Sequence, residues 1–346
     1  MEFRVRLLGI EAGGHLIVVM GSRDAEGLGV VSSDRVRLRA EGSEAVAILN
    51  IAGEFPSGVL GVYREVASRL GLGDGDVVEV EAAERPESLS LVRRKIMGEK
   101  LTPWEMEMIV EDVVERHLSD VEIAAFVTAL EIHGVSMEEA EALSLAMVKK
   151  GRTLNFGEGP ILDKHSIGGV PGDKTTIIVV PIVAAAGYRI PKTSSRAITS
   201  PAGTADRMET LAPVALKADE IIEVVNRVGG CIVWGGALDL APADDLFIRV
   251  EYPLAIDPLL LPSIMSKKRA VGSTHVVVDI PTGRGAKVKT IGQAHTLAME
   301  FIELGSRLGM EVECAVTEGE QPIGYAIGPT LEAREALETL KGGGPR

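Results

Sequence analysis

The sequence is poor in the residues that support disulfide chemistry and in thermolabile amides. Its 346 residues include two cysteines, Cys231 and Cys314, which are far apart and have no CxxC spacing. A disulfide framework is therefore excluded, and two small apolar side chains in a reducing compartment are the favoured interpretation. The chain has three asparagines and two glutamines. Such a low content of side-chain amides is typical of proteins from hot habitats.

Metal-ligand spacings, long apolar runs and net positive charge are also missing. The six histidines show no HExxH-like spacing, so no metal site is predicted. The longest apolar run, at 177–187, is interrupted by Pro181 and is too short to span a bilayer. The charged N-terminal segment does not resemble a signal peptide. A net charge of −14 disfavours non-specific nucleic-acid binding, because phosphate backbones need a basic face. We therefore expect a cytoplasmic protein whose partners are small molecules.

The first part of the chain has the pattern of a β-rich domain. Apolar and polar residues alternate at 3–7, 15–20, 36–40, 44–51 and 77–83, and turn signals separate these segments. One helix is predicted at 63–72. Residues 1–84 are thus expected to form a small β-rich domain without catalytic residues of its own.

Helical start signals follow, and then helices and strands alternate. Thr102, Ser119 and Ser136 each stand three residues before a glutamate, and an apolar pattern of helical period follows each of them. Beyond residue 161, helices are predicted at 218–228, 291–308 and 330–340, and strands at 231–234, 275–280 and 312–316. This alternation predicts an α/β fold with a mixed, mostly parallel sheet flanked by helices.

A glycine-rich segment at 163–176, DKHSIGGVPGDKTT, is the strongest functional signal. Consecutive glycines let backbone N–H groups converge on an anion. Lys164 adds a positive charge, and Ser166 and Thr176 add hydroxyl donors. The apolar run that follows can begin as a helix, whose N-terminus also favours an anion. A plain turn is the alternative, but this combination favours a phosphate site.

Three further segments have the chemistry of phosphate or nucleotide binding. Residues 192–204, KTSSRAITSPAGT, hold six hydroxyl side chains and two cations and are interpreted as a loop at the carboxyl end of the sheet. Residues 263–269, SIMSKKR, and 281–287, PTGRGAK, combine cations with hydroxyls or glycines. Each alone also fits a solvated loop or a basic helix end. Together with the glycine-rich segment, they predict a substrate set with two phosphate groups.

These motifs resemble a known enzyme family. DKHSIGGVPGDK, SSRAITSPAGTADRMETL, LAPADD and SIMSKK resemble, in the same order, the motifs of the thymidine phosphorylase and pyrimidine nucleoside phosphorylase family. The extra N-terminal domain and the segment SSRAITSPAGT resemble the corresponding parts of the archaeal-type AMP phosphorylases. Compared with thymidine phosphorylase, the glycine loop has one additional residue, Pro171. Family members extend further at the C-terminus, so the chain is expected to be C-terminally truncated.

The resemblance implies a reaction and the residues that serve it. AMP and inorganic phosphate give adenine and ribose 1,5-bisphosphate, with CMP and UMP as further candidate substrates. Asp257 is implied as the proton donor and His165 as a further catalytic candidate, although a capping carboxylate and a structural histidine are the alternatives. The implied phosphate-binding residues are Lys164, Ser166, Thr176, Ser194 and Thr204. The implied AMP-binding residues are Gly169, Ser195, Arg196, Ala197, Ile198, Thr199, Ser200, Thr204, Ser263, Lys267 and Lys287. Phosphate is the co-substrate, and no cofactor is implied.

The expected architecture combines these observations. Residues 1–84 form the β-rich domain, 85–150 and 238–272 a helical domain, and 151–237 and 273–346 the α/β phosphate-binding domain. The resemblance implies a homodimer, with higher assembly in a longer form. Three alternatives stay open: a pyrimidine nucleoside phosphorylase, a phosphoribosyltransferase like anthranilate phosphoribosyltransferase, and a truncated chain that binds nucleotide without turnover. Residues 1–84 and Lys287 argue against the first. The glycine loops lack the acidic cluster that would hold Mg²⁺ for the second.

Overall fold

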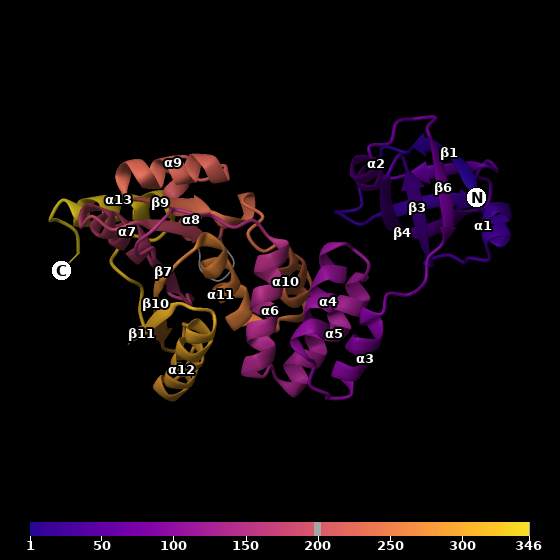
Figure 1. The fold of residues 1–346 in the computed structure, drawn as a ribbon. Helices are drawn as coiled ribbons and strands as arrows, with labels where there is room; N and C mark the ends of the chain where they lie inside the picture. Colours follow the sequence, from indigo (N-terminus) through magenta and orange to yellow (C-terminus); the bar gives the residue numbers. More distant parts are fainter. Residues whose placement is uncertain (197–201, 346) are drawn as a thin grey trace. The chain divides into compact units, whose positions relative to one another are not determined.

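The computed structural model describes residues 1–196 and 202–345 of the chain (Figure 1). Two compact units can be distinguished: Met1–Arg93 with Asp112–Ile123, and Arg94–Glu111 with Ala124–Arg346. In the described part of the chain, no helix has the length and apolar character needed to cross a membrane. Cys231 and Cys314 are free thiols.

The first unit contains a closed six-stranded barrel. Its strands are β1 (Glu2–Leu7), β2 (Ile17–Gly21), β3 (Arg35–Ala40), β4 (Ser43–Ala52), β5 (Val59–Val62) and β6 (Val77–Ala82). The order around the barrel is β1-β5-β2-β4-β3-β6, with β1–β5 and β2–β4 parallel. Two short helices, α1 (Ser22–Leu28) and α2 (Arg64–Leu70), accompany it. Because apolar residues alternate along the strands, side chains such as Phe3, Val5, Val18 and Met20 fill the interior.

The β-rich domain predicted from the alternating pattern is confirmed, and two of its elements were not predicted. Strand β5 reads VLGV, which is short and has no alternation. Helix α1 reads SRDAEGL and contains one glycine and few apolar residues. Strand β5 pairs with β1 and β2, and α1 packs on β2 and β4, so tertiary contacts rather than local sequence determine both elements.

Four helices come next: α3 (Ser88–Ile96), α4 (Pro103–Val114), α5 (Asp120–His133) and α6 (Met137–Lys150). The three predicted capping boxes are present. The cap hydroxyl accepts a hydrogen bond from the backbone N–H of the glutamate three residues on, at 3.3 Å for Thr102–Glu105, 3.4 Å for Ser119–Glu122 and 3.3 Å for Ser136–Glu139. Each glutamate in turn accepts from the cap residue's backbone N–H. These reciprocal bonds satisfy donors that the first helical turn leaves free.

The remaining strands are all parallel. β7 (Leu162–Ser166), β10 (His275–Thr282) and β11 (Glu311–Glu318) form a sheet in the order β11-β10-β7, and β8 (Ile190–Ser194) pairs with β9 (Gly230–Trp234). A parallel bridge between Ile161 and Arg189 connects the two sheets. The predicted mostly parallel sheet is therefore confirmed.

Seven α-helices accompany these strands in the described residues: α7 (Thr175–Ala185), α8 (Thr204–Glu209), α9 (Ala218–Val228), α10 (Pro242–Leu254), α11 (Leu260–Val271), α12 (Ile291–Arg307) and α13 (Pro329–Leu340). Helix α12 packs on β10 and β11 (Figure 1). There, Phe301 lies in one core with Val276, Val278 and Ile280. Helices α10 and α11 pack against α6, with which the sequence grouped them in one helical domain.

One interpretation from the sequence needs correction. The Ser/Thr-rich segment that begins at Lys192 was interpreted as a loop, but Lys192, Thr193 and Ser194 belong to strand β8. The apolar run before it is helix α7, in agreement with the helix start that the sequence allowed there. Parallel pairing of Lys192 with Ile232 and of Thr193 with Val233 holds this polar strand in the sheet.

Candidate active site

A cavity of about 700 Å³ lies where several parallel strands end. Ser166 is the last residue of β7, Ser194 the last of β8 and Trp234 the last of β9, and all three line this cavity. Helices α10 and α11 supply further lining residues. A crevice at the carboxyl ends of parallel strands is the usual ligand site of an α/β sheet, and the volume suits a small organic substrate.

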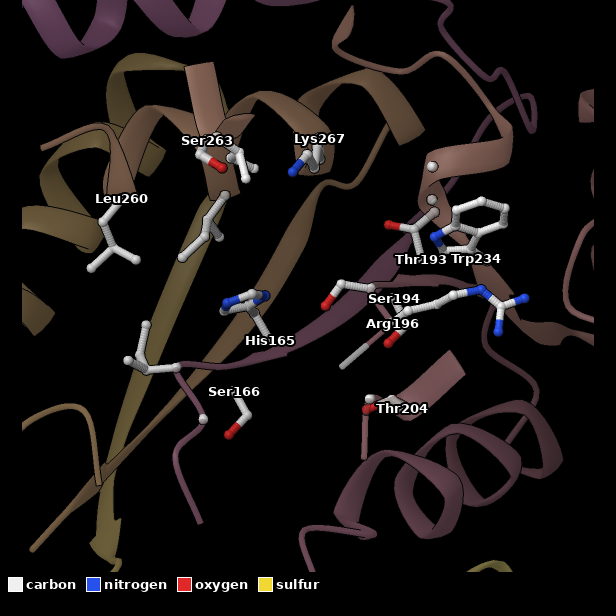
Figure 2. Close-up of a pocket in the computed structure, with 18 of the residues that line it drawn as sticks. His165, Ser166, Thr193, Ser194, Arg196, Thr204, Trp234, Leu260, Ser263 and Lys267 are labelled. Atoms are coloured by element: carbon white, nitrogen blue, oxygen red, sulfur yellow. The ribbon is translucent and has the colours of Figure 1, made fainter. Parts of the chain in front are cut away.

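One part of the cavity is rich in hydroxyl groups. Ser166, Thr176, Ser194 and Thr204 all line it, as the phosphate-binding prediction requires (Figure 2 shows three of the four). Thr176 lies in the first turn of α7, where free backbone N–H groups and the helix dipole favour an anion. These side chains come from segments far apart in the sequence, and together they provide the donors that a phosphate group needs.

Three cations that were not predicted individually as site residues also line the cavity: Lys192, Arg207 and Lys268. Lys192 and Lys268 belong to the segments 192–204 and 263–269, which the sequence predicted to bind phosphate or nucleotide. All three are buried. The Lys268 Nζ lies 2.8 Å from an oxygen of Asp163, whereas Arg207 pairs with Glu332 and keeps one buried terminal nitrogen without a hydrogen-bond partner among the described residues. Burial, with Lys268 nearby, holds the pKa of Lys192 well below its ordinary value.

His165 lies next to these lysines and lines the same cavity. Burial, followed by the charges of Lys268, Lys192 and Lys164, holds the pKa of His165 well below 6.5. The imidazole is therefore neutral at physiological pH and can exchange hydrogen bonds with a substrate. In Figure 2 it lies across the cavity from Ser263 and Lys267 of α11.

Lys164 occupies a different position from the other predicted phosphate-binding residues. Its side chain lines a second cavity of about 410 Å³, together with residues of β10 and α7. The Nζ atom lies 3.6 Å from Asp279, whose carboxylate accepts a hydrogen bond of 2.9 Å from the Ser166 hydroxyl. Lys164 is thus connected to the first cavity through Asp279 and Ser166 in this structure.

The predicted base-facing and nucleotide-facing residues also line the first cavity. They are Asp257, Ser263, Lys267 and Lys287. The Lys267 Nζ lies 2.5 Å from the fully buried Asp244, and although burial acts to lower the pKa of Lys267, the nearby Asp244 raises it overall. The Lys287 Nζ donates a hydrogen bond of 3.1 Å to Asp257.

Gly169 brings two glycine-rich segments together. Its φ is +88°, and a Cβ atom built on it would lie 2.7 Å from the backbone nitrogen of Lys287. Only glycine therefore fits here without displacing the 281–287 segment that carries Lys287.

The remaining predicted AMP-binding residues lie in the 194–204 segment. Ser195 and Arg196 line the cavity. Arg196 pairs with Glu209 and Asp206 at 2.7 Å and 3.1 Å, and its guanidinium lies 4.8 Å from the centre of the Trp234 ring (Figure 2). Ala197, Ile198, Thr199 and Ser200 were also predicted and lie outside the described residues.

Helix α10 contributes two acidic residues that were not among the predicted site residues, Asp245 and Glu251. Asp245 is the last residue of the LAPADD motif, whereas Glu251 belongs to no recognisable motif, so only the tertiary structure identifies it. Burial is the main cause that raises the pKa of each carboxyl, to about 8 for Glu251. Within the described ranges, no group of three or more His, Cys, Asp or Glu residues has the arrangement of a metal site.

Comparison with known proteins connects this site to a family. Residues 158–344 match the α/β domain of a glycosyl transferase family, and residues 89–151 match its helical bundle domain. The AMP phosphorylase of Thermofilum pendens is 53% identical over 99% of this chain and 66% of its own length. The AMP phosphorylase of Pyrococcus furiosus is 50% identical, over 99% of this chain and 68% of its own. The chain thus spans about two thirds of the length of these relatives.

A solved structure shares the fold. Anthranilate phosphoribosyltransferase from Thermus thermophilus superposes with a TM-score of 0.61 at 21% sequence identity, over 74% of this chain and 83% of that one. At this identity the likeness shows the fold alone.

Proposed function

This chain belongs to the AMP phosphorylase family, and we propose that it catalyses the phosphorolysis of nucleoside 5′-monophosphates. AMP and inorganic phosphate would give adenine and ribose 1,5-bisphosphate, with CMP and UMP as further substrates. The enzyme would be a pentosyltransferase. The observation that carries the proposal is one cavity lined both by Ser166, Thr176, Ser194 and Thr204 and by Ser263, Lys267 and Lys287.

The hydroxyl-rich part of the cavity suits the attacking phosphate. The four hydroxyls would donate to its oxygens, and the buried cations Arg207 and Lys268 would supply a positive field. The site would hold the phosphate in line with the bond to be broken. This positioning converts a bimolecular encounter into a reaction within one complex.

The opposite part of the cavity suits the nucleotide. As the glycosidic bond lengthens, the ribosyl carbon gains positive charge and the base gains negative charge, as in glycoside hydrolysis. A phosphate oxygen then bonds to C1′, and the electrons of the C1′–N bond pass to the base. Ser263 and Lys267 would face the base, and Lys287 the nucleotide. The predicted proton donor Asp257 lies beside Lys287.

Other properties are proposals that follow from the sequence and the family. We expect inorganic phosphate as the co-substrate and no cofactor. We also expect a homodimer, a cytoplasmic location and an origin in a hot habitat. The archaeal relatives and the low amide content support the last of these.

The direct test is base release from AMP, CMP, UMP, adenosine and thymidine, each with and without phosphate. Phosphate-dependent release from the nucleoside monophosphates, with adenosine and thymidine inert, is the expected result. Release from thymidine alone would instead identify a nucleoside phosphorylase. AMP binding by calorimetry without any turnover would show a nucleotide-binding chain.

A further inference from the structure

Arg207 is a buried arginine at the wall of the cavity. It belongs to the short helix α8, three residues after Thr204, and both residues line the cavity. The exposed fraction of Arg207 is 2%. One of its terminal guanidinium nitrogens, Nη2, has no hydrogen-bond partner among the described residues. Because a buried polar atom without a partner is costly, this geometry favours a guanidinium group that a ligand completes.

A buried carboxylate fixes the position of this guanidinium group. The Nε atom of Arg207 donates a hydrogen bond to Oε2 of Glu332 on α13, a residue whose exposed fraction is 0%. The other carboxylate oxygen of Glu332 accepts a hydrogen bond of 2.9 Å from the backbone N–H of Gly328, at the start of the same helix. Since both oxygens of Glu332 are engaged, the orientation of the carboxylate is set. It holds one edge of the guanidinium group, and Nη2 remains available to a further acceptor.

Arg207 lies between two segments that supply hydroxyl groups to the proposed phosphate site. Thr204 precedes it on α8, and α8 contacts α7, whose first turn carries Thr176. The charge of Arg207 also acts on the glycine-rich segment. Burial acts to raise the pKa of Asp173 there, but the charges of Lys164 and Arg207 are among the causes that hold this pKa below its ordinary value. The surroundings of Arg207 are therefore those of the attacking phosphate.

We propose that Arg207 binds the attacking phosphate directly, by donating a hydrogen bond from Nη2 to one of its oxygens. The inference rests on the proposed phosphorolysis and adds a ligand to its phosphate site. Arginine suits this position because its guanidinium group carries several N–H donors in one plane, so one edge pairs with Glu332 while another faces the anion. A hydrogen bond between two charged groups is stronger than one between neutral groups. Glu332 is the positioning residue of this pair.

The first test is the Arg207→Lys variant. Lysine keeps the positive charge and the pairing with Glu332, but its single ammonium group has no second nitrogen for the phosphate. The Kd for inorganic phosphate, measured by calorimetry without nucleotide, should rise about ten- to hundredfold, which is the loss expected for a hydrogen bond to a charged group. A Kd equal to that of the wild type would overturn the inference.

AMP brings a second phosphate group to the cavity, and its binding separates the two sources. The Kd for AMP, measured in phosphate-free buffer, should be the same for Arg207→Lys and the wild type. In turnover, the KM for phosphate should rise, whereas the KM for AMP at saturating phosphate should stay near its wild-type value. A loss confined to AMP would assign Arg207 to the nucleotide, and an equal loss for both ligands would indicate a distorted site. Either result would contradict the proposal.

A double variant tests Arg207 in a protein that has no unpaired charge at this position. In Arg207→Met/Glu332→Leu, apolar side chains replace the buried ion pair, an exchange that many proteins tolerate. Phosphate should raise the melting temperature of the wild type, because a ligand that binds the native state stabilises it. The increase should be much smaller for the double variant at the same phosphate concentration. Equal increases in both proteins would rule out a direct contact between Arg207 and phosphate.

Glu335→Gln is the matched control. Glu335 follows Glu332 by three residues on α13 and pairs at 2.5 Å with Lys174, a buried cation that is not one of the described residues lining the cavity. This variant breaks a second buried ion pair on the same helix, so its melting temperature should fall while its Kd for phosphate stays at the wild-type value. If Glu335→Gln weakened phosphate binding as much as Arg207→Lys does, the effect would come from α13 as a whole, and the inference would fail.

Failure of the proposed function has a different signature from failure of this inference. A wild type that neither binds phosphate nor releases base from AMP would overturn the phosphorolysis, and the role of Arg207 with it. A wild type that does both, with an Arg207→Lys variant of equal affinity for phosphate, would overturn only the role of Arg207.

Discussion

At the residue scale, burial sets the charge of several groups around the cavity. Lys192 and His165 have pKa values held well below their ordinary values by burial and by neighbouring lysines. A protonated group that is buried beside other positive charges is costly, and losing the proton relieves that cost. A bound phosphate anion reverses the balance, since it stabilises the protonated forms.

Phosphate binding should therefore be coupled to proton uptake. The phosphate dianion raises the pKa values of Lys192 and His165, so protons enter the site as the anion binds. Calorimetry of phosphate binding in buffers with different ionisation enthalpies measures this uptake, at about pH 8 where the dianion predominates.

Lys192→Met is the variant for this measurement, because methionine replaces the lysine stem with an apolar chain of similar length. Proton uptake should be positive in the wild type and smaller in the variant. Proton release, or an uptake that Lys192→Met does not change, would contradict the coupling between phosphate binding and protonation of Lys192.

At the element scale, the site depends on close contact between two glycine-rich segments. Replacing Gly169 by alanine should disturb that contact, because φ is +88° and the new Cβ would lie 2.7 Å from the Lys287 backbone nitrogen. A left-handed alanine alone costs about 1–2 kcal/mol. We expect a loss of stability of this size, together with an increase in KM for AMP on the order of tenfold as Lys287 is displaced.

Gly285→Ala is the control, since Gly285 lies in the same 281–287 segment and an added Cβ meets nothing within 4 Å. Its KM and melting temperature should equal those of the wild type. If Gly169→Ala behaved like this control, the packing of the two segments would have no part in binding AMP.

The sequence predicted those helices and strands that short sequence patterns mark. The capping boxes at Thr102, Ser119 and Ser136 mark helix starts because hydroxyl and glutamate side chains satisfy the first-turn donors themselves. Strand β8 was not predicted because Lys192, Thr193 and Ser194 are polar, and Lys192 and Thr193 are buried only in the folded sheet, where they pair with β9. The stability of β8 depends on its pairing within the sheet, and a short stretch of sequence does not reveal that pairing.

The site residues that belong to sequence motifs could be predicted from the sequence. Ser166, Thr176 and Ser194 were found because hydroxyls and glycines cluster near cations in the sequence. Arg207 lies within the SSRAITSPAGTADRMETL motif but was not among the predicted site residues, and Glu251 belongs to no motif. Both are buried at the cavity wall, and this burial is a consequence of tertiary packing that the sequence does not show.

At the scale of the whole molecule, an acidic chain gathers several cations around one cavity. The net charge is −14, yet Lys192, Arg207, Lys267 and Lys268 all line one cavity. Concentrating positive charge there, rather than over the surface, favours small phosphate-bearing molecules over nucleic acids. This distribution agrees with the family to which the chain belongs.

The central claim is that phosphate, and not water, attacks the ribosyl carbon. Phosphorus NMR of the reaction with AMP and inorganic phosphate distinguishes the two outcomes directly. We predict equimolar adenine and ribose 1,5-bisphosphate, with inorganic phosphate consumed in the same amount. Adenine accompanied by ribose 5-phosphate, at a rate independent of phosphate, would contradict the account and identify a hydrolase.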